Sequence, residues 1–203
     1  MPSIYDLKPK FQGLLRPSVT RMATAGVTAN QVTVLATMVS ILAGSMIAAF
    51  PDSKWPLAIL PVTLLFRMSL NAVDGMLARE FGQKSRLGAV LNELGDVISD
   101  IALYLPLAMV PDINSAGVIG FVIASVVVEF TGVIALQVGS ERRYDGPMGK
   151  SDRAFWIGLL ATLLALGWMR PNWTLAYFAV LIFLTILTIG NRASRALGAS
   201  TKN

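Results

Sequence analysis

Residues 71–100, NAVDGMLAREFGQKSRLGAVLNELGDVISD, carry amide, carboxylate and guanidinium side chains within an otherwise strongly apolar chain. Ionisable groups at membrane depth are costly to bury, so they indicate a functional site. The polar and small residues recur mainly at intervals of three, four and nine, as expected for two helices that each turn one polar face toward a shared centre. These residues are Asn71, Asp74, Gly75, Ala78, Arg79, Gly88, Asn92, Asp96 and Asp100.

The composition is typical of a polytopic membrane protein. Of the 203 residues, 54% are hydrophobic and 14% are charged. Cysteine and histidine are both absent, which excludes disulfides, thiol nucleophiles, imidazole bases and the usual zinc sites. A metal here must be a hard cation held by oxygen, Mg²⁺ or Mn²⁺, and a general base must be a carboxylate. The net charge of +5 indicates basic loops beside anionic membrane lipids; we expect no nucleic-acid partner.

We expect an all-α integral membrane fold that forms one domain over residues 1–203. About 20 apolar residues cross a bilayer as a helix. Residues 4–22 alternate apolar and basic side chains, which predicts an amphipathic helix on the membrane surface, although a solvated tail is the alternative. Six transmembrane helices are predicted at about 31–50, 55–78, 88–110, 115–138, 154–170 and 173–192.

The basic residues predict the topology, because cytoplasmic loops carry an excess of Lys and Arg. Fourteen lie in segments that would share one side, only Lys54 and Arg170 lie opposite, and Arg67 falls within a span. Both termini and the polar cluster should therefore face the cytoplasm. The fourteen are Lys8, Lys10, Arg16, Arg21, Arg79, Lys84, Arg86, Arg142, Arg143, Lys150, Arg153, Arg192, Arg195 and Lys202.

The two polar faces suit chemistry on a diphosphate. Oxygen-bearing faces that meet in a cavity can hold hard divalent cations, and such cations can clamp a diphosphate. Gly75, Ala78 and Gly88 leave room for a bulky ligand or a close backbone. Arg79 supplies a fork of donors that suits phosphate oxygens.

This pattern resembles the signature of the CDP-alcohol phosphotransferases, D-x2-D-G-x2-A-R-x8-G-x3-D-x3-D. The chain reads N-x2-D-G-x2-A-R-x8-G-x3-N-x3-D from Asn71 to Asp96, so every interval, both glycines and the Ala-Arg pair match. The segment VTANQVT at 27–33 also resembles the start of that family's first span. Within the family, the chain is most similar to a group of bacterial inner-membrane proteins.

The resemblance implies a role for each matched residue. Asp74, Asp96, Asn71 and Asn92 would lie at the metal site. Asp96 would be the base that deprotonates the acceptor hydroxyl. The diphosphate of the donor would lie against Asp74, Gly75, Ala78, Arg79 and Gly88.

Two positions depart from the signature, because Asn71 and Asn92 stand where the family has aspartates. An amide still offers an oxygen to a cation but carries no charge. We therefore expect weaker metal binding, one metal instead of two, or a different selectivity. Asp100 lies one turn beyond Asp96 and is the residue best placed to restore a charge and share in catalysis.

The segment ERRYDGPMGKSDRAF at 141–155 is the second polar concentration. Lys150, Arg153 and Arg142 would bind an anionic acceptor there, such as a phosphorylated polyol, or the phosphates of the donor, or they reflect only the excess of cytoplasmic positive charge. Within the spans, Arg67 and Glu129 would form an ion pair that lowers the cost of burying both, and a role for Arg67 in substrate binding is the alternative.

The stretch GVIGFVIAS at 117–125 has small residues that permit close helix contact. Such contact would occur within one chain or at a homodimer interface.

The leading functional hypothesis is a metal-dependent enzyme of phospholipid synthesis, in a membrane-lipid environment. The family resemblance implies that it would transfer a phosphatidyl group from CDP-diacylglycerol to a small polar alcohol or phosphorylated polyol and release CMP. The alternative is a catalytically weakened relative that binds CDP-lipids or has a structural role. A transporter is less favoured, because no pair of Gly/Pro-broken spans occupies corresponding halves.

Overall fold

The computed structural model describes the backbone of residues 4–200 and the side chains of residues 11–198. Within that part of the chain all regular structure is helical. The side chains of Lys8, Lys10 and Lys202, three of the fourteen basic residues expected on the cytoplasmic side, lie outside the described residues. The elements are α1 (Ile4–Thr24), α2 (Ala29–Ala49), α3 (Lys54–Glu80), α4 (Arg86–Tyr104), η1 (Leu105–Met109), α5 (Ser115–Ile134), η2 (Ala135–Val138), α6 (Lys150–Ala165) and α7 (Pro171–Ser200).

Side-chain caps set the starts of two helices that border the polar cluster. Before α2, the Thr28 hydroxyl accepts a hydrogen bond from the Gln31 backbone at 3.2 Å, and the Gln31 side chain accepts one from the Thr28 backbone at 2.9 Å. Before α4, the Ser85 hydroxyl accepts a hydrogen bond from the Gly88 backbone at 2.9 Å. The sequence thus fixes where both helices begin.

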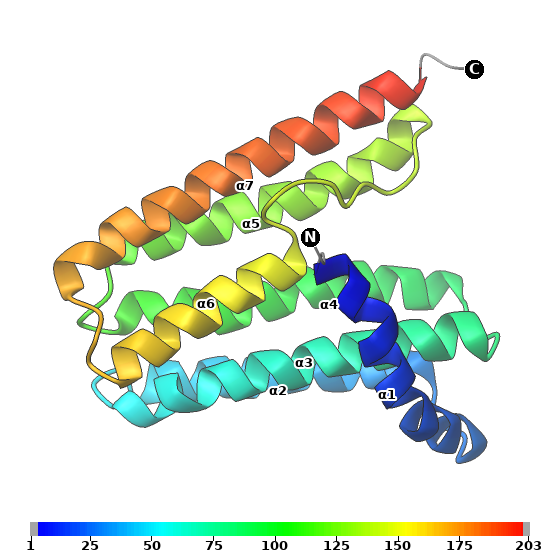
Figure 1. Ribbon diagram of the computed structural model, residues 1–203, viewed down its shortest axis with the longest axis horizontal. Coiled ribbons are helices and arrows are strands. Elements are labelled where there is room, and N and C mark those ends of the chain that lie inside the picture. Colours follow the sequence, from blue (N-terminus) through cyan, green and yellow to red (C-terminus); the bar gives the residue numbers. More distant parts are fainter. Residues whose placement is uncertain (1–3, 201–203) are drawn as a thin grey trace.

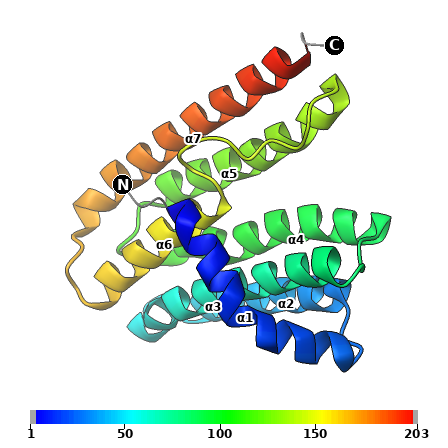
Figure 2. The ribbon, with the colours of Figure 1, turned by 45° about the vertical axis from the view of Figure 1, so that its right-hand side comes forward.

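The helices form two groups with α6 beside them (Figures 1 and 2). Helices α2, α3 and α4 pack together in one group, and α5 packs along α7 in the other. Helix α6 contacts α3, and α1 crosses the outside of the first group to pack against α3. Val19 of α1 is fully buried there, whereas Leu14 is 76% exposed, so α1 uses one apolar face for the contact. Its position relative to a membrane surface stays a prediction.

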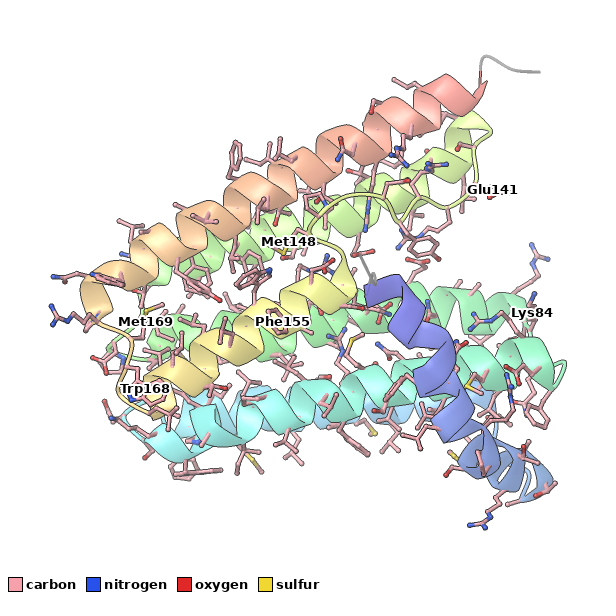
Figure 3. All side chains as sticks on the ribbon, in the orientation of Figure 1. Lys84, Glu141, Met148, Phe155, Trp168 and Met169 are labelled. Atoms are coloured by element: carbon pink, nitrogen blue, oxygen red, sulfur yellow. The ribbon has the colours of Figure 1, made fainter. Side chains whose placement is uncertain are left out.

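The connections alternate between the two ends of the molecule. Lys84, between α3 and α4, and Glu141, between α5 and α6, lie at one end in Figure 3. Trp168 and Met169, between α6 and α7, lie at the opposite end. The basic connections therefore share one end of the bundle, as the charge pattern predicts.

The connection from α5 to α6 runs back along the bundle before α6 begins (Figures 1 and 2). The backbone of Arg143 donates to the Gly132 carbonyl at 3.2 Å, and that of Met148 donates to the Thr188 hydroxyl at 2.9 Å. Gly146 has a φ of +112°, and a Cβ on it would lie 2.5 Å from Thr188. This connection carries the start of α6 into the bundle, which explains why α6 has only 16 residues.

Small residues permit two close helix contacts. A Cβ on Gly44 of α2 would lie 1.8 Å from the Ala102 carbonyl oxygen of α4. In α5, Gly117 and Gly120 face Phe178 and Ile182 of α7. The small-residue stretch thus packs within one chain, and a homodimer stays a prediction.

Four helical stretches are long and apolar enough to cross a membrane, counted over the described residues: Ala29–Ala49, Lys54–Glu80, Ser115–Val138 and Pro171–Gly198. Helix α4 carries several charges, and α6 is short. Six segments of the expected kind are present as helices, but spanning by α4 and α6 stays a prediction.

Candidate active site

Asp96 lies where three helices meet. Its Oδ2 accepts a hydrogen bond of 2.6 Å from Lys150 Nζ of α6. Its Oδ1 accepts one of 3.3 Å from the amide nitrogen of Asn71 of α3. Arg67 Nη2 lies 3.5 Å from Oδ1, and the Asp96 side chain is 13% exposed. These contacts fix the orientation of a carboxylate that solvent can still reach.

Asp100, one turn further along α4, is buried between two arginines. Arg67 Nη1 donates to its Oδ1 at 2.7 Å. Arg153 donates to its Oδ2 from Nε at 2.9 Å and from Nη2 at 2.7 Å. The carboxylate is 4% exposed, and neither arginine is more than 1% exposed. Removal of one partner from such a group would leave a buried charge unpaired.

Glu129 of α5 extends the ion pairs into the second helix group. Arg153 Nη2 donates to its Oε1 at 2.8 Å, and Arg142 Nη2 donates to its Oε2 at 2.7 Å. Arg192 Nη1 of α7 lies 3.5 Å from the same Oε2. Arg142 also makes a two-pronged contact with Glu93 of α4, at 2.9 and 2.8 Å.

The expected ion pair between Arg67 and Glu129 is wrong. Arg67 lies four residues before Asn71, so it shares the α3 face that looks toward α4, and it pairs there with Asp96 and Asp100. Glu129 instead pairs with Arg153 of α6, Arg192 of α7 and Arg142 of the connection between α5 and α6.

Helix α2 forms a third wall of the site, which the sequence reasoning missed. The Thr33 hydroxyl donates to Asp74 Oδ2 at 2.8 Å. A Cβ on Gly95 of α4 would lie 2.8 Å from the Thr37 hydroxyl. A Cβ on Gly88 would lie 2.8 Å from the side-chain oxygen of Asn30. The spacing of Asn30, Thr33 and Thr37 on one helix face was the signal that could have revealed this wall.

Gly75 makes room for Arg79. A Cβ at position 75 would lie 2.8 Å from Arg79 Nη2, so the guanidinium folds over the glycine. Arg79 is exposed at the end of α3, and Ala78 beside it is half-buried. The Gly-x2-Ala-Arg part of the signature thus presents a guanidinium at the edge of the site.

The other predicted metal ligands are only partly brought together. Asn71 contacts Asp96, whereas Asp74 is bonded to Thr33. Asn92 is half-buried one turn before Asp96. Among the described residues, no group of three or more carboxylate, imidazole or thiol side chains converges as a metal site. The signature positions offer oxygen ligands, but only Asp74 and Asp96 among them carry a carboxylate.

The basic segment 141–155, which leads into α6 and includes its first turn, divides into two parts. Arg142, Lys150 and Arg153 point into the bundle and pair with acidic residues, so they do more than add positive charge to a loop. Asp145 pairs instead with Arg143 at 2.7 Å and with exposed Arg195 at 2.5 Å. Burial opposes ionisation of Asp145, but the hydrogen bonds and charges of these arginines outweigh burial and lower its pKa.

Comparisons with known proteins agree with the signature. The family model described as CDP-alcohol phosphatidyltransferase matches residues 26–190. Inner membrane protein YnbA of Escherichia coli (strain K12) is 44% identical over 199 residues, with 96% of each chain covered. That likeness and the apolar helices support a bacterial inner-membrane protein.

Solved structures show the same fold. One is the crystal structure of Mycobacterium tuberculosis phosphatidylinositol phosphate synthase (PgsA1) with CDP-DAG bound, with a TM-score of 0.73, 21% identity, and coverage of 89% of this chain and 92% of that chain. The same enzyme in complex with manganese and citrate gives a TM-score of 0.74, 21% identity, and coverage of 89% and 88%. The chain therefore belongs to the CDP-alcohol phosphatidyltransferase family.

Proposed function

We propose that this protein transfers a phosphatidyl group from CDP-diacylglycerol to a small alcohol and releases CMP, as a step of phospholipid synthesis. The observation that carries the proposal is the setting of Asp96, a signature carboxylate that three helices orient and that stays partly exposed. Family membership and the likeness to a synthase with CDP-DAG bound support the choice of donor.

The proposed reaction assigns a separate task to each part of the site. Asp96 accepts the proton of the acceptor hydroxyl, and that oxygen forms a bond to the phosphorus next to diacylglycerol. The bond from that phosphorus to the CMP oxygen breaks, and CMP leaves. Arg79 lies over Gly75 and would hold diphosphate oxygens. Lys150 and Asn71 would keep the Asp96 carboxylate in place.

The donor types at the signature positions suit one divalent cation. Asp74 and Asp96 offer carboxylate oxygens, and Asn71 and Asn92 offer amide oxygens, all hard ligands that suit Mg²⁺ or Mn²⁺. When bound, the cation would neutralise charge on the diphosphate. The likeness to a synthase in complex with manganese supports a divalent ion.

For Asp100 we propose a positioning role in place of direct catalysis. Its two oxygens are occupied by Arg67 and Arg153, and only 4% of its side chain is exposed. Through its contacts with these two arginines, Asp100 would hold α3 and α6 in place next to Asp96.

The test is CMP release by the purified protein from CDP-diacylglycerol, with and without Mn²⁺, over a panel of alcohols. Metal-dependent CMP with at least one acceptor is expected. Saturable binding of CDP-diacylglycerol without CMP release would favour the alternative of a catalytically weakened CDP-lipid-binding protein, which the two asparagines make worth testing. If the protein neither binds CDP-diacylglycerol nor releases CMP, both the enzymatic function and the lipid-binding function are contradicted.

A further inference from the structure

We infer that the acceptor alcohol carries no phosphate group, an inference that rests on the proposed function. The basic residues that surround Asp96 are already bound to carboxylates of the same chain. Few hydrogen-bond donors of these side chains therefore remain to bind a phosphate on the acceptor.

Arg153 has at most one N–H left for a ligand, the second one on Nη1. Its Nε and Nη2 donate to Asp100, Nη2 also donates to Glu129, and Nη1 donates to the Met148 carbonyl at 3.3 Å. The side chain is 0% exposed. A phosphate could reach it only by displacing two buried carboxylates.

Arg142 is occupied in the same way. Its Nε and Nη2 hold Glu93, Nη2 also holds Glu129, and Nη1 donates to the Arg143 carbonyl at 2.8 Å. Its side chain is 13% exposed, whereas that of Glu93 is 31% exposed. The more accessible charge of this pair is thus the carboxylate, which repels a phosphate and accepts hydrogen bonds from hydroxyls.

Three further cations, Lys150, Arg67 and Arg192, add little for a phosphate. Lys150 is 26% exposed and one of its three N–H groups donates to Asp96, so it is a single cation that a phosphate would have to share with a carboxylate. Arg67 has one nitrogen, Nε, without a partner among the described residues, but the side chain is 1% exposed. Arg192 is 1% exposed and donates to the Val128 carbonyl at 2.6 Å. A neutral polyol or a zwitterionic alcohol needs none of these pairs to open.

The test compares each alcohol with its own phosphate. CMP release from CDP-diacylglycerol with Mn²⁺ is measured with glycerol against glycerol 3-phosphate, and with myo-inositol against inositol phosphate. We expect kcat/KM for at least one unphosphorylated alcohol to exceed that for its phosphate by about tenfold or more. A preference of that size for the phosphate would overturn the inference and leave the proposed function intact.

A binding measurement decides the inference even if no acceptor is turned over. By calorimetry we expect no saturable binding of glycerol 3-phosphate to the wild-type protein below about 1 mM. Saturable binding in that range would overturn the inference. A complete lack of CMP release would count only against the proposed function.

Glu93→Gln tests the reason for the exclusion. The variant keeps the shape of the side chain but removes one of the two charges that hold Arg142, so saturable binding of glycerol 3-phosphate should appear below about 1 mM. Glu141→Gln is the matched control, because Glu141 is exposed on the same connection as Arg142 and should bind like the wild type. If Glu93→Gln folds and binds no more tightly than the control, the pairing does not exclude phosphate and the inference fails.

Discussion

Lys150 Nζ lies 2.6 Å from Asp96 Oδ2, although the two residues are 54 positions apart in the chain. The contact exists because the connection between α5 and α6 runs back into the bundle before α6 begins (Figure 1). A lysine that would otherwise lie in a basic loop therefore meets the signature carboxylate. This convergence of α4 and α6 gives Asp96 a fixed orientation without complete burial.

Replacement of Asp96 by asparagine should abolish turnover without loss of the fold. The amide keeps the size of the side chain but cannot accept the acceptor proton, so kcat should fall by at least about a hundredfold. Binding of CDP-diacylglycerol should remain. The measurements are CMP release and calorimetric binding of the CDP-lipid.

Asp112→Asn is the matched control for that variant, because Asp112 is an exposed aspartate in the connection between α4 and α5. It should retain wild-type turnover. Unchanged turnover in Asp96→Asn would show that Asp96 is not the base.

Replacement of Arg153 by alanine should destabilise the whole protein. The change leaves Asp100 and Glu129 with fewer partners in a buried setting, which costs about 3–5 kcal/mol in comparable cases. The apparent melting temperature in detergent, followed by intrinsic tryptophan fluorescence, should fall. Arg170→Ala, at an exposed arginine before α7, should melt like the wild type.

Asp100→Asn should also melt at a lower temperature, because it weakens the hold on Arg67 and Arg153. The two measurements distinguish the roles of the two carboxylates, because Asp96→Asn should lower activity and leave the melting temperature nearly unchanged. A variant Asp100→Asn that melts like the wild type but releases no CMP would contradict a positioning role and support a catalytic one.

The topology can be tested with single cysteines, because the chain has none of its own. Lys84 and Trp168 lie at opposite ends of the molecule in Figure 3, and Trp168 is 73% exposed. In intact bacterial cells, Trp168→Cys should react with a membrane-impermeant maleimide, whereas Lys84→Cys should react only after the membrane is opened. The reverse pattern would place both termini and the site on the outer face.

The helices were predictable because long apolar runs and caps are local features. Helix α4 ends at Tyr104 and passes into a 3-10 turn, where Pro106 cannot continue the helical hydrogen bonds. Helix α6 starts at Lys150, earlier than hydropathy indicates, because Asp152 accepts a hydrogen bond from the Gly149 backbone at 3.0 Å. Gly167, with a φ of +71°, follows its end.

The pairing of the buried charges was not predictable from spacing alone. Spacing places Arg67 on the face of Asn71, but the choice of Asp100 over Glu129 depends on how α3, α4 and α5 are rotated against one another. The contact of Thr33 with Asp74 likewise depends on the packing of α2 against α3. Such contacts join residues far apart in the chain, so no local pattern specifies them.

The two asparagines of the signature should set the number of metal ions at one. With Asp74 and Asp96 as the only signature carboxylates, the site lacks the charge to hold two divalent cations close together. Equilibrium dialysis with Mn²⁺, followed by elemental analysis, should give one ion per chain. Two ions in the wild type would contradict this account.

The double variant Asn71→Asp with Asn92→Asp should bind Mn²⁺ about tenfold more tightly or take up a second ion, because ligand charge raises the affinity for a hard cation. Asn172→Asp adds a negative charge at an exposed position in the first turn of α7 and is the control. If the double variant and the control bind Mn²⁺ alike, charge at the two asparagine positions does not govern metal binding. Lys150 would then be the next residue to test, since its ammonium already occupies one oxygen of Asp96.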